Sequence, residues 1–199
     1  DILNFQNSFQ LLNQYCCSAK ADVDIFVDAG NTGAFATHYL NPKGKNLFYI
    51  SLGMGGMGNS IGAAMGSCFA SGKKTYALVG DGAFLMYGLE IHTALLHQLP
   101  IVFVIFNNNS HGMCSTREDI FLGPQSGINN FTKTFFAQGF KNMFPQLQAA
   151  EVNSLSEFNS ALQQMHPLNT TSLISVNIAV NTEVPPFQSF IKHPSTPKK

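Results

Sequence analysis

The sequence predicts an α/β fold: a doubly wound, mainly parallel sheet with helices on both faces. Two segments, residues 75–79 and 101–106, have the near-continuous apolar composition of strands that are buried on both faces of such a sheet. Residues 89–98 lie between them and suit a crossover helix, the connection that parallel strands require. The chain has 199 residues, which is enough for one domain with a substantial core.

Helices and strands alternate in the first half of the chain. Apolar residues at helical spacing between residues 5 and 15 predict an N-terminal helix, and a strand is expected at 24–28. The turn at 29–33 is expected to open a second helix. An apolar segment at 47–50 leads into a glycine-rich run, which is expected to open a third.

The alternation continues beyond the second long strand. Residues 115–130 contain serine, glycine and proline and are expected to form a loop along one wall of the functional site. A helix is expected at 131–138, where Gly139 would end it. A short strand is expected at 146–150.

The last predicted elements are a helix and a strand. Ser154 is followed three residues later by Glu157, which is a capping box, so a helix is expected to start there. Residues 173–180 are expected to form the closing strand. We therefore expect one domain over residues 1–180 and an extended C-terminal tail over residues 181–199, which contain four prolines.

The composition narrows the possible partners. Hydrophobic residues make up 45% of the chain and charged residues 11%, against about 25% charged in a typical soluble domain, so much of the surface is expected to contact protein in a homo- or hetero-oligomer. Eleven basic and eleven acidic residues cancel, which argues against nucleic acid or an anionic membrane as a partner. No apolar run approaches the ~18 residues of a membrane span and no leader is visible, so a cytoplasmic location is expected.

The most informative motif is Gly80-Asp81-Gly82, followed after 24 residues by Asn107-Asn108. Asp81 follows one predicted strand and Asn108 follows the next, and ligands of open α/β sheets bind outside the carboxyl ends of the strands. We therefore expect both side chains to face the same crevice. Mg²⁺ is usually bound by one or two carboxylates together with phosphate oxygens, so this pair predicts a magnesium diphosphate site. Gly82 would let its backbone N–H approach the phosphate.

With this spacing the sequence resembles the thiamine diphosphate enzymes, whose cofactor signature is GDG followed by NN. Further similarity lies in the glycine run at 53–58, in residues 84–86 and in residues 107–113, which are most like the acetolactate synthase and 2-oxo acid decarboxylase branch. The order of elements is similar from residue 24 to residue 180. The resemblance implies the thiamine diphosphate-binding fold and, within it, the diphosphate-binding (PP) domain.

The resemblance also implies roles for individual residues. Asp81, Asn108 and the backbone carbonyl of Ser110 would bind Mg²⁺. The carbonyl of Gly55 and the N–H of Met57 would contact the aminopyrimidine of thiamine diphosphate, with the Met57 side chain between the two cofactor rings. Residues of two strand-to-helix turns would contact the cofactor diphosphate, namely Gly30, Asn31 and Thr32 in the first turn and Gly80, Gly82 and Ala83 in the second.

Alternative interpretations remain for both glycine-containing turns. The run at 53–58 satisfies the G-x-G-x-x-G fingerprint of nicotinamide dinucleotide domains, and Asp81 lies 23 residues beyond its end, where a ribose-binding acid is expected. That alternative does not explain the asparagine pair. Glycines spaced by four from Gly58 could simply bring a helix close to the sheet, and the turn at 29–33 could be an ordinary helix N-cap.

The catalytic residues remain unknown at this level. In the enzymes that the sequence resembles, a glutamate of a separate pyrimidine-binding domain activates the cofactor, and no segment here resembles that domain. His111, three positions beyond Asn108, is a candidate proton shuttle or contact for a substrate carboxylate, or else a loop histidine bonded to backbone. Asp28, at the end of its predicted strand, could face the crevice or serve in the turn.

Two positions bear on the substrate. Simple pyruvate decarboxylase-like enzymes have a glutamate six residues beyond the second asparagine, where this chain has Cys114. The difference favours an acetolactate synthase-like reaction, in which a second 2-oxo acid is the acceptor. Acetolactate synthases tend to have tryptophan three positions further on, where this chain has Arg117, which puts the usual second substrate in question and indicates an anionic one.

The sequence therefore predicts the diphosphate- and Mg²⁺-binding domain of a thiamine diphosphate-dependent 2-oxo acid decarboxylase or carboligase, a lyase or transferase. Such a domain would be catalytically incomplete alone and would need a pyrimidine-binding domain from another region or subunit. A non-catalytic partner or scaffold domain of the same fold is the first alternative. A nicotinamide-binding domain is the second.

Overall fold

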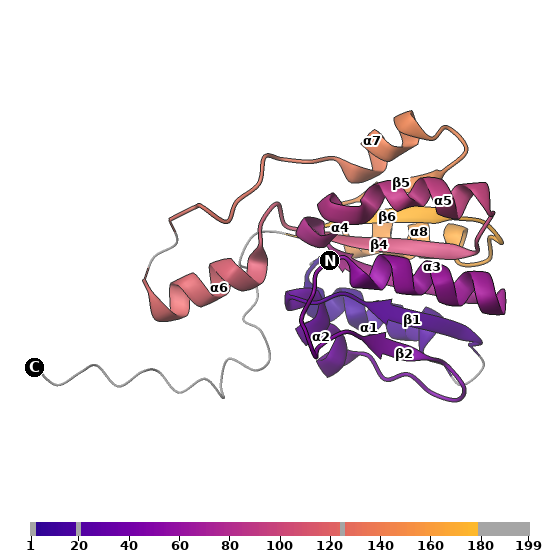
Figure 1. Ribbon diagram of the computed structural model, residues 1–199, viewed down its shortest axis with the longest axis horizontal. Helices are drawn as coiled ribbons and strands as arrows, with labels where there is room; N and C mark the ends of the chain where they lie inside the picture. Colours follow the sequence, from indigo (N-terminus) through magenta and orange to yellow (C-terminus); the bar gives the residue numbers. More distant parts are fainter. Residues whose placement is uncertain (1–2, 19–20, 124–125, 179–199) are drawn as a thin grey trace, which may run out of the picture.

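The structure is a computed structural model that describes residues 3–18, 21–123 and 126–178. Within these ranges, six strands form one sheet in which every neighbouring pair is parallel, in the order β2-β1-β3-β4-β6-β5 (Figure 1). The strands are β1 (Val23–Val27), β2 (Phe48–Ile50), β3 (Lys74–Gly80), β4 (Ile101–Asn107), β5 (Gln148–Val152) and β6 (Ser172–Asn177).

Helices cover both faces of this sheet, which confirms the predicted fold class. One face is covered by α1 (Phe5–Cys16), α2 (Asn31–Tyr39) and α8 (Leu155–Met165). The other is covered by α3 (Asn59–Ser71), α4 (Asp81–Tyr87), the 3₁₀ turn η1 (Gly88–Glu90), α5 (Ile91–Leu96) and α7 (Phe136–Met143). A further helix, α6 (Gly112–Phe121), extends away from the layers (Figure 1).

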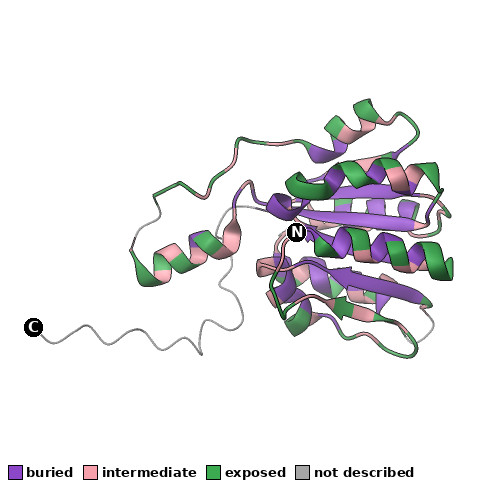
Figure 2. Ribbon diagram, viewed as in Figure 1, coloured by how far each residue is buried: buried purple, intermediate pink, exposed green. Residues whose placement is uncertain are grey.

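Two apolar cores, one on each face of the sheet, hold the layers together. Along β4, Val104 belongs to the core shared with α1 and α2, whereas its neighbours Phe103 and Ile105 belong to the core shared with α3 and α5. All residues of β4 are buried (Figure 2). Burial on both faces explains why the sequence of this strand is apolar throughout rather than at alternate positions.

The predicted capping box is present. Ser154 is the N-cap of α8, and its Oγ accepts a hydrogen bond from the N–H of Glu157 at 3.2 Å. The carboxylate of Glu157 reaches one residue further back than expected and accepts from the N–H of Asn153 at 2.7 Å.

The connection between β3 and β4 differs from the predicted single helix at 89–98. The chain becomes helical at Asp81, directly after β3, and continues through α4, η1 and α5 to Leu96. The interruption falls at Gly88, where an added Cβ would meet the ring of Phe84 at 2.6 Å. Gln98 has a φ of 51°, which ends the helical path.

The segment after β4 also differs from prediction. Residues 112–121, most of which were expected in a loop, form α6. The helix expected at 131–138 lies instead at Phe136–Met143, with Gly139 inside it. The cause is Asn109, whose carbonyl accepts from the N–H of Phe131 at 2.7 Å and whose Oδ1 accepts from that of Thr134 at 2.8 Å. These bonds hold residues 131–134 beside the end of β4, so the helix begins only at Phe136.

Two further predictions concern the last strands and the C-terminal tail. The strand expected at 146–150 begins two residues later, as β5, and the closing strand expected at 173–180 ends at Asn177. Residues 179 and 180 and the predicted tail 181–199 lie outside the described residues. Within the described part, no helix is long and apolar enough to cross a membrane.

The topology places a crevice between β1 and β3. From β1 the chain adds β2 on one side of the sheet and then returns to add β3 and β4 on the other. In open α/β sheets, ligands bind at the carboxyl ends of the strands where the direction of winding changes in this way. The turns that follow β1, β3 and β4 meet at this point.

Candidate cofactor and metal site

Asp81 lies at the carboxyl end of β3 and is 3% exposed. Its Oδ1 accepts a hydrogen bond from the N–H of Gly82 at 2.8 Å. Its Oδ2 accepts from the N–H groups of Asn108 and Ser110, each at 3.1 Å. Backbone donors from two neighbouring strand ends thus fix the carboxylate. The N–H of Gly82, expected from the sequence to face the phosphate, is engaged by Asp81 instead.

Asn108 lies beside Asp81 at the end of β4. Its Oδ1 accepts from the N–H of Ser110 at 3.1 Å, so the oxygens of Asp81 and Asn108 share one donor and stand close together. The hydroxyl of Ser110 points elsewhere, 2.9 Å from Oγ of Ser115 and donating to the carbonyl of Asn129 at 3.1 Å. The side chain of Ser110 is therefore occupied, and its backbone is the part that lies near the Asp81–Asn108 pair.

The environment of Asp81 suits a cation. Burial raises the pKa of this carboxyl group from 3.8 to about 6, although the backbone N–H groups counteract part of the shift. A divalent cation beside the carboxylate would favour its charged form. In the described part of the chain no three His, Cys, Asp or Glu side chains cluster as metal ligands, so an ion here would depend on one carboxylate together with carboxamide and carbonyl oxygens. Such oxygen donors fit Mg²⁺.

The turn after β1 forms the opposite wall of the crevice. Gly30 is the N-cap of α2 and has a φ of 96°, a conformation that favours glycine. The first N–H groups of a helix have no partner within it, so the start of α2 offers backbone donors at this wall. Oδ1 of Asn31 is buried and has no hydrogen-bond partner among the described residues. A Cβ added to Gly112 would lie 2.7 Å from Nδ2 of Asn108 and 3.2 Å from that of Asn31, so the two carboxamides approach the same point.

A small cavity of about 70 Å³ opens between these strand ends. Every predicted site residue except Gly55 lines it, namely Gly30, Asn31, Thr32, Met57, Gly80, Asp81, Gly82, Ala83, Asn108, Ser110 and His111. Gly55 lines a neighbouring cavity of about 710 Å³ that shares Ala29, Gly30 and Met113 with the small one. The site thus has a narrow part at the strand ends and a wide part between α2, the glycine turn and α6.

Met57 and His111 both lie against Gly82. A Cβ added there would be 2.7 Å from Nδ1 of His111 and 3.2 Å from Cε of Met57, so glycine leaves room for both side chains. The N–H of His111 donates to the carbonyl of Asn129 at 2.9 Å, and its ring packs edge-on against Phe131 with 4.5 Å between centroids. His111 therefore lines the cavity while its backbone is fixed by the loop.

The two positions that bear on the substrate lie on α6. Cys114 lines the small cavity, and Arg117 lines the wide one together with His38 of α2. None of the residues that line the wide cavity is acidic. The wide cavity therefore carries a positive charge at its edge.

Sequence reasoning missed two features of the site. Phe5, at the start of α1, lines the small cavity, and no local pattern in the sequence indicates this long-range contact. Asp28 turns toward α3 rather than into the crevice, and its carboxylate accepts from the hydroxyl of Ser60 at 2.6 Å. The sequence does contain one indication of this contact. Gly58 has no side chain that could cap α3, so the start of this helix needs an acceptor from elsewhere.

The fold and the site together define a doubly wound α/β domain whose ligand crevice lies at the switch point of a parallel sheet. The family comparison is more specific. Residues 28–176 match the family described as "Thiamine pyrophosphate enzyme, C-terminal TPP binding domain", and the chain belongs to this family.

Individual relatives agree with this family. The chain is 29% identical over 147 residues to a probable acetolactate synthase large subunit of Methanococcus aeolicus, which covers 70% of this chain and 23% of that protein. It is 31% identical over 104 residues to sulfoacetaldehyde acetyltransferase of Alcaligenes xylosoxydans xylosoxydans, which covers 52% of this chain and 17% of the other. The chain therefore spans less than a quarter of the length of these relatives.

A solved structure shows the same fold. Benzoylformate decarboxylase from Polynucleobacter necessarius superposes with a TM-score of 0.76 at 20% sequence identity, over 88% of this chain and 33% of that one.

Proposed function

We propose that this chain binds the diphosphate of thiamine diphosphate through Mg²⁺, as the PP domain of a 2-oxo acid decarboxylase or carboligase. The observation that carries the proposal is the convergence of the Asp81 carboxylate and the Asn108 carboxamide, whose oxygens share the N–H of Ser110. Asp81, Asn108 and the carbonyl of Ser110 would supply three oxygens to the ion. Diphosphate oxygens and water would complete its octahedron.

The diphosphate would lie against the start of α2. Gly30, Asn31 and Thr32 stand at this helix terminus, where backbone N–H groups attract anions. The buried Asn31 carboxamide supports the assignment, because its Oδ1 has no hydrogen-bond partner among the described residues and a flip of the amide would place its Nδ2 donor there, toward an anion. The short residues Gly80, Gly82 and Ala83 would form the floor and leave room for the phosphates.

The cofactor, when bound, supplies a carbon nucleophile at C2 of its thiazolium ring. The residues of this chain would bind and orient it: the carbonyl of Gly55 and the N–H of Met57 would contact the aminopyrimidine, and the Met57 side chain would support the bent cofactor. The activating glutamate would come from a pyrimidine-binding domain elsewhere in the same protein or in another subunit.

An exposed apolar face supports a partner domain or subunit. It comprises six side chains of α3, α4, η1 and α5 that are each more than half exposed, namely Phe69, Leu85, Met86, Tyr87, Leu89 and Leu96. Contacts join the elements at both ends of this face. The ring of Phe69 lies 5.2 Å from that of His97, and Gly58 abuts Tyr87. Exposed apolar side chains that gather on neighbouring elements in this way are typical of protein–protein contact.

The substrate would be a 2-oxo acid. Cys114 replaces the acid that a simple decarboxylase-like reaction would use, which favours transfer to a second substrate. Arg117 and His38 line the wide cavity without an acidic neighbour, which favours an anionic acceptor.

The proposal is tested in the complete protein that contains this chain. Thiamine diphosphate binding is titrated by calorimetry with and without Mg²⁺, for the wild type and for Asp81→Ala and Asn108→Ala. Both substitutions are expected to weaken Mg²⁺-dependent binding by about 10- to 100-fold, as losses around a metal site do. Asp22→Ala is the control, because this acid is 72% exposed and pairs with Lys73 at 2.8 Å, away from the crevice.

Normal affinity in Asp81→Ala would contradict the assignment. Release of CO₂ from pyruvate distinguishes the enzyme from the alternative of a scaffold domain, since a scaffold would bind cofactor without turnover. The nicotinamide alternative predicts binding of NAD⁺ in the same titration, and the family match gives it no support.

A further inference from the structure

The carboxylate of Asp28 joins the two turns that are proposed to hold the cofactor. Its Oδ1 accepts hydrogen bonds from the N–H of Ala29 at 2.9 Å and from that of Gly58 at 3.0 Å. Its Oδ2 accepts from the N–H of Ser60 at 3.2 Å and from its hydroxyl at 2.6 Å. The residue is 1% exposed, and all four contacts come from donors, so both side-chain oxygens act as acceptors.

Asp28 provides the start of α3 with its cap. A helix leaves its first N–H groups without partners, and Gly58, the N-cap of α3, has no side chain to satisfy them. The missing acceptor is Asp28, the residue directly after β1, which lies 30 residues earlier in the sequence than Gly58. The position of the helix start therefore depends on a residue of another element.

The glycine turn 53–58 needs such an external support. Four of its six residues are glycine, so the turn has little conformational preference of its own. Met54 at its tip is 93% exposed. The hydrogen bond from the N–H of Gly58 to Asp28 fixes the end of the turn, directly after Met57. Cε of Met57 in turn reaches the surface of Gly82.

We propose that Asp28 is a positioning residue, which places Met57 at the cofactor cavity by holding the N–H groups of Gly58 and Ser60. Ser60 shares this role through its short bond to Asp28. The inference rests on the proposed function for its consequence in cofactor binding. The support of the turn itself is a property of this chain that can be measured without cofactor.

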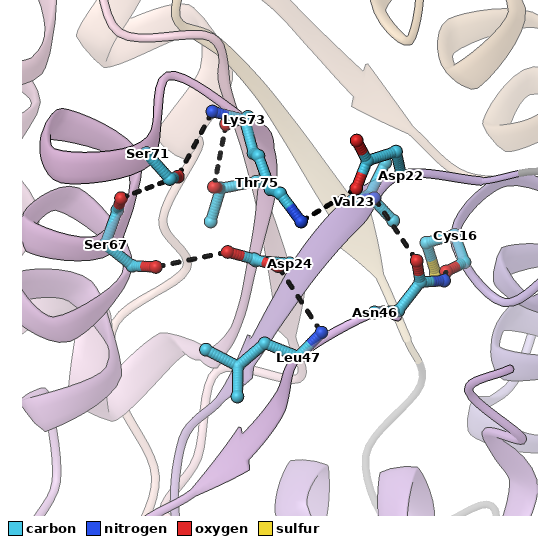
Figure 3. A network of polar contacts seen from close by, with 10 residues as sticks. All are labelled: Cys16, Asp22, Val23, Asp24, Asn46, Leu47, Ser67, Ser71, Lys73 and Thr75. Atoms are coloured by element: carbon cyan, nitrogen blue, oxygen red, sulfur yellow. Dashed lines mark hydrogen bonds and ion pairs between the residues drawn. The ribbon is translucent and has the colours of Figure 1, made fainter. Parts of the chain in front are cut away.

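The same strand and helix offer a matched control at the opposite end. Asp24 of β1 accepts from the hydroxyl of Ser67 of α3 at 3.2 Å and from the N–H of Leu47 at 3.3 Å (Figure 3). β1 and α3 run in opposite directions, so Asp28 and Ser60 pair at the cofactor end while Asp24 and Ser67 pair at the far end. Asp24 is 5% exposed. Both carboxylates attach α3 to β1, but Asp28 alone contacts the glycine turn.

The first measurement is amide hydrogen exchange of the complete protein without cofactor, for Asp28→Asn and Asp24→Asn. An asparagine keeps the shape of the side chain, but its NH₂ group faces donors whichever way the amide turns. Asp28→Asn is expected to speed exchange in a peptide spanning residues 52–61 by about tenfold or more, the effect of losing hydrogen bonds to a charged acceptor. Asp24→Asn is expected to leave this peptide unchanged.

The second measurement is the affinity for thiamine diphosphate with Mg²⁺. Asp28→Asn is expected to weaken it by about tenfold, and Asp24→Asn by less than about twofold, when the two variants lose similar thermal stability. Ser60→Ala and Ser67→Ala repeat the comparison with a smaller change. They keep the proposal testable if Asp28→Asn does not fold.

The outcomes separate the two proposals. Equal exchange in the 52–61 peptide for both aspartate variants, or for both serine variants, overturns the positioning role. Equal losses of affinity at matched stability overturn it as well. If the wild type does not bind thiamine diphosphate, the proposed function fails, and the exchange experiment still decides whether Asp28 holds the turn.

Discussion

The imidazole of His111 covers Gly82, with its Nδ1 2.7 Å from the point where a Cβ of residue 82 would stand. Cε of Met57 lies 3.2 Å from the same point. Two loops that are far apart in the sequence therefore pack on the GDG turn. The side chains of His111 and Met57 can both reach this turn because residue 82 has no Cβ.

Gly82→Ala is expected to displace His111 or Met57 and thereby to weaken thiamine diphosphate binding. Overpacking of this kind costs about 1–3 kcal/mol. Calorimetric titration and thermal unfolding of the complete protein measure both effects. An unchanged affinity in Gly82→Ala would show that the cofactor does not approach this turn.

Gly139→Ala is the control for the glycine replacement. Gly139 lies inside α7, and an added Cβ meets no atom within 4 Å. Because alanine is a better helix former, this substitution is expected to stabilise the protein by about 0.5–1 kcal/mol without changing cofactor affinity. A loss of stability would contradict the position of Gly139 within the helix.

Gly58→Ala is expected to be more costly than Gly72→Ala. Both glycines flank α3 with positive φ, 84° and 68°, so alanine is strained by about 1 kcal/mol or more at either position. At Gly72 an added Cβ meets open space, whereas at Gly58 it would clash with the ring of Tyr87. Chemical denaturation of both variants measures the excess free energy of the clash.

The contact with Tyr87 can be isolated by a double substitution. Gly58→Ala combined with Tyr87→Ala is expected to recover the excess and to leave the backbone strain that Gly72→Ala also shows. If Gly58→Ala lowers the free energy of unfolding as much in the Tyr87→Ala background as in the wild type, the ring of Tyr87 is not the obstacle.

Local sequence signals predicted the central strands and the crevice between them. The central residues of β3 and β4 are apolar because both faces of the sheet are covered. A polar residue follows β3, namely Asp81, and another ends β4, namely Asn107, because the strand ends face the crevice. The positions of Asp81 and Asn108 after successive strands predicted that they lie close together, since neighbouring parallel strands end at the same edge of the sheet. The Ser154 cap of α8 could also be predicted from the sequence, because capping involves residues only three positions apart.

Long-range contacts explain what the sequence did not predict. The start of α7 depends on hydrogen bonds from Asn109 to residues 131–134, and no propensity of that segment indicates them. The carboxylate of Glu118 in α6 accepts from the N–H of Ser126, which lies beyond the end of this helix, at 2.8 Å. The support of the glycine turn by Asp28 joins residues 30 apart. Such contacts override local preference and become visible only in the folded chain.

The exposed apolar face predicts that the protein associates through this face and that a charged substitution there disrupts the association. Leu89 and Leu96 are 64% and 68% exposed, so Leu89→Lys and Leu96→Lys are expected to leave the domain folded while lowering the mass of the complete protein measured by light scattering. Ile128→Lys is the control, since Ile128 is 84% exposed but lies outside this face. An unchanged mass in both leucine variants would mean that another surface forms the assembly.

Lys74 predicts a pH dependence of stability at the end of the sheet remote from the cofactor crevice. Its Nζ donates to the carbonyl of Leu168 at 2.6 Å and to that of Met165 at 3.3 Å, and burial lowers its pKa to about 8. An unfolded lysine titrates near pH 10.4, so between about pH 8 and 10.4 the unfolded chain binds more protons than the folded one. The contribution of Lys74 to the free energy of unfolding is therefore expected to rise with pH in this window.

Chemical denaturation at several pH values between 7 and about 10 checks this, with Lys74→Met as the variant that lacks the titrating group. The free energy of unfolding of the wild type, relative to Lys74→Met, is expected to increase across the window. Lys73→Met is the control, because Lys73 pairs with Asp22 and this contact raises its pKa, so its contribution would be lost only above the window. A difference between wild type and Lys74→Met that stays constant up to pH 10 would mean that the ammonium group is not destabilised by its burial between β3 and the end of α8.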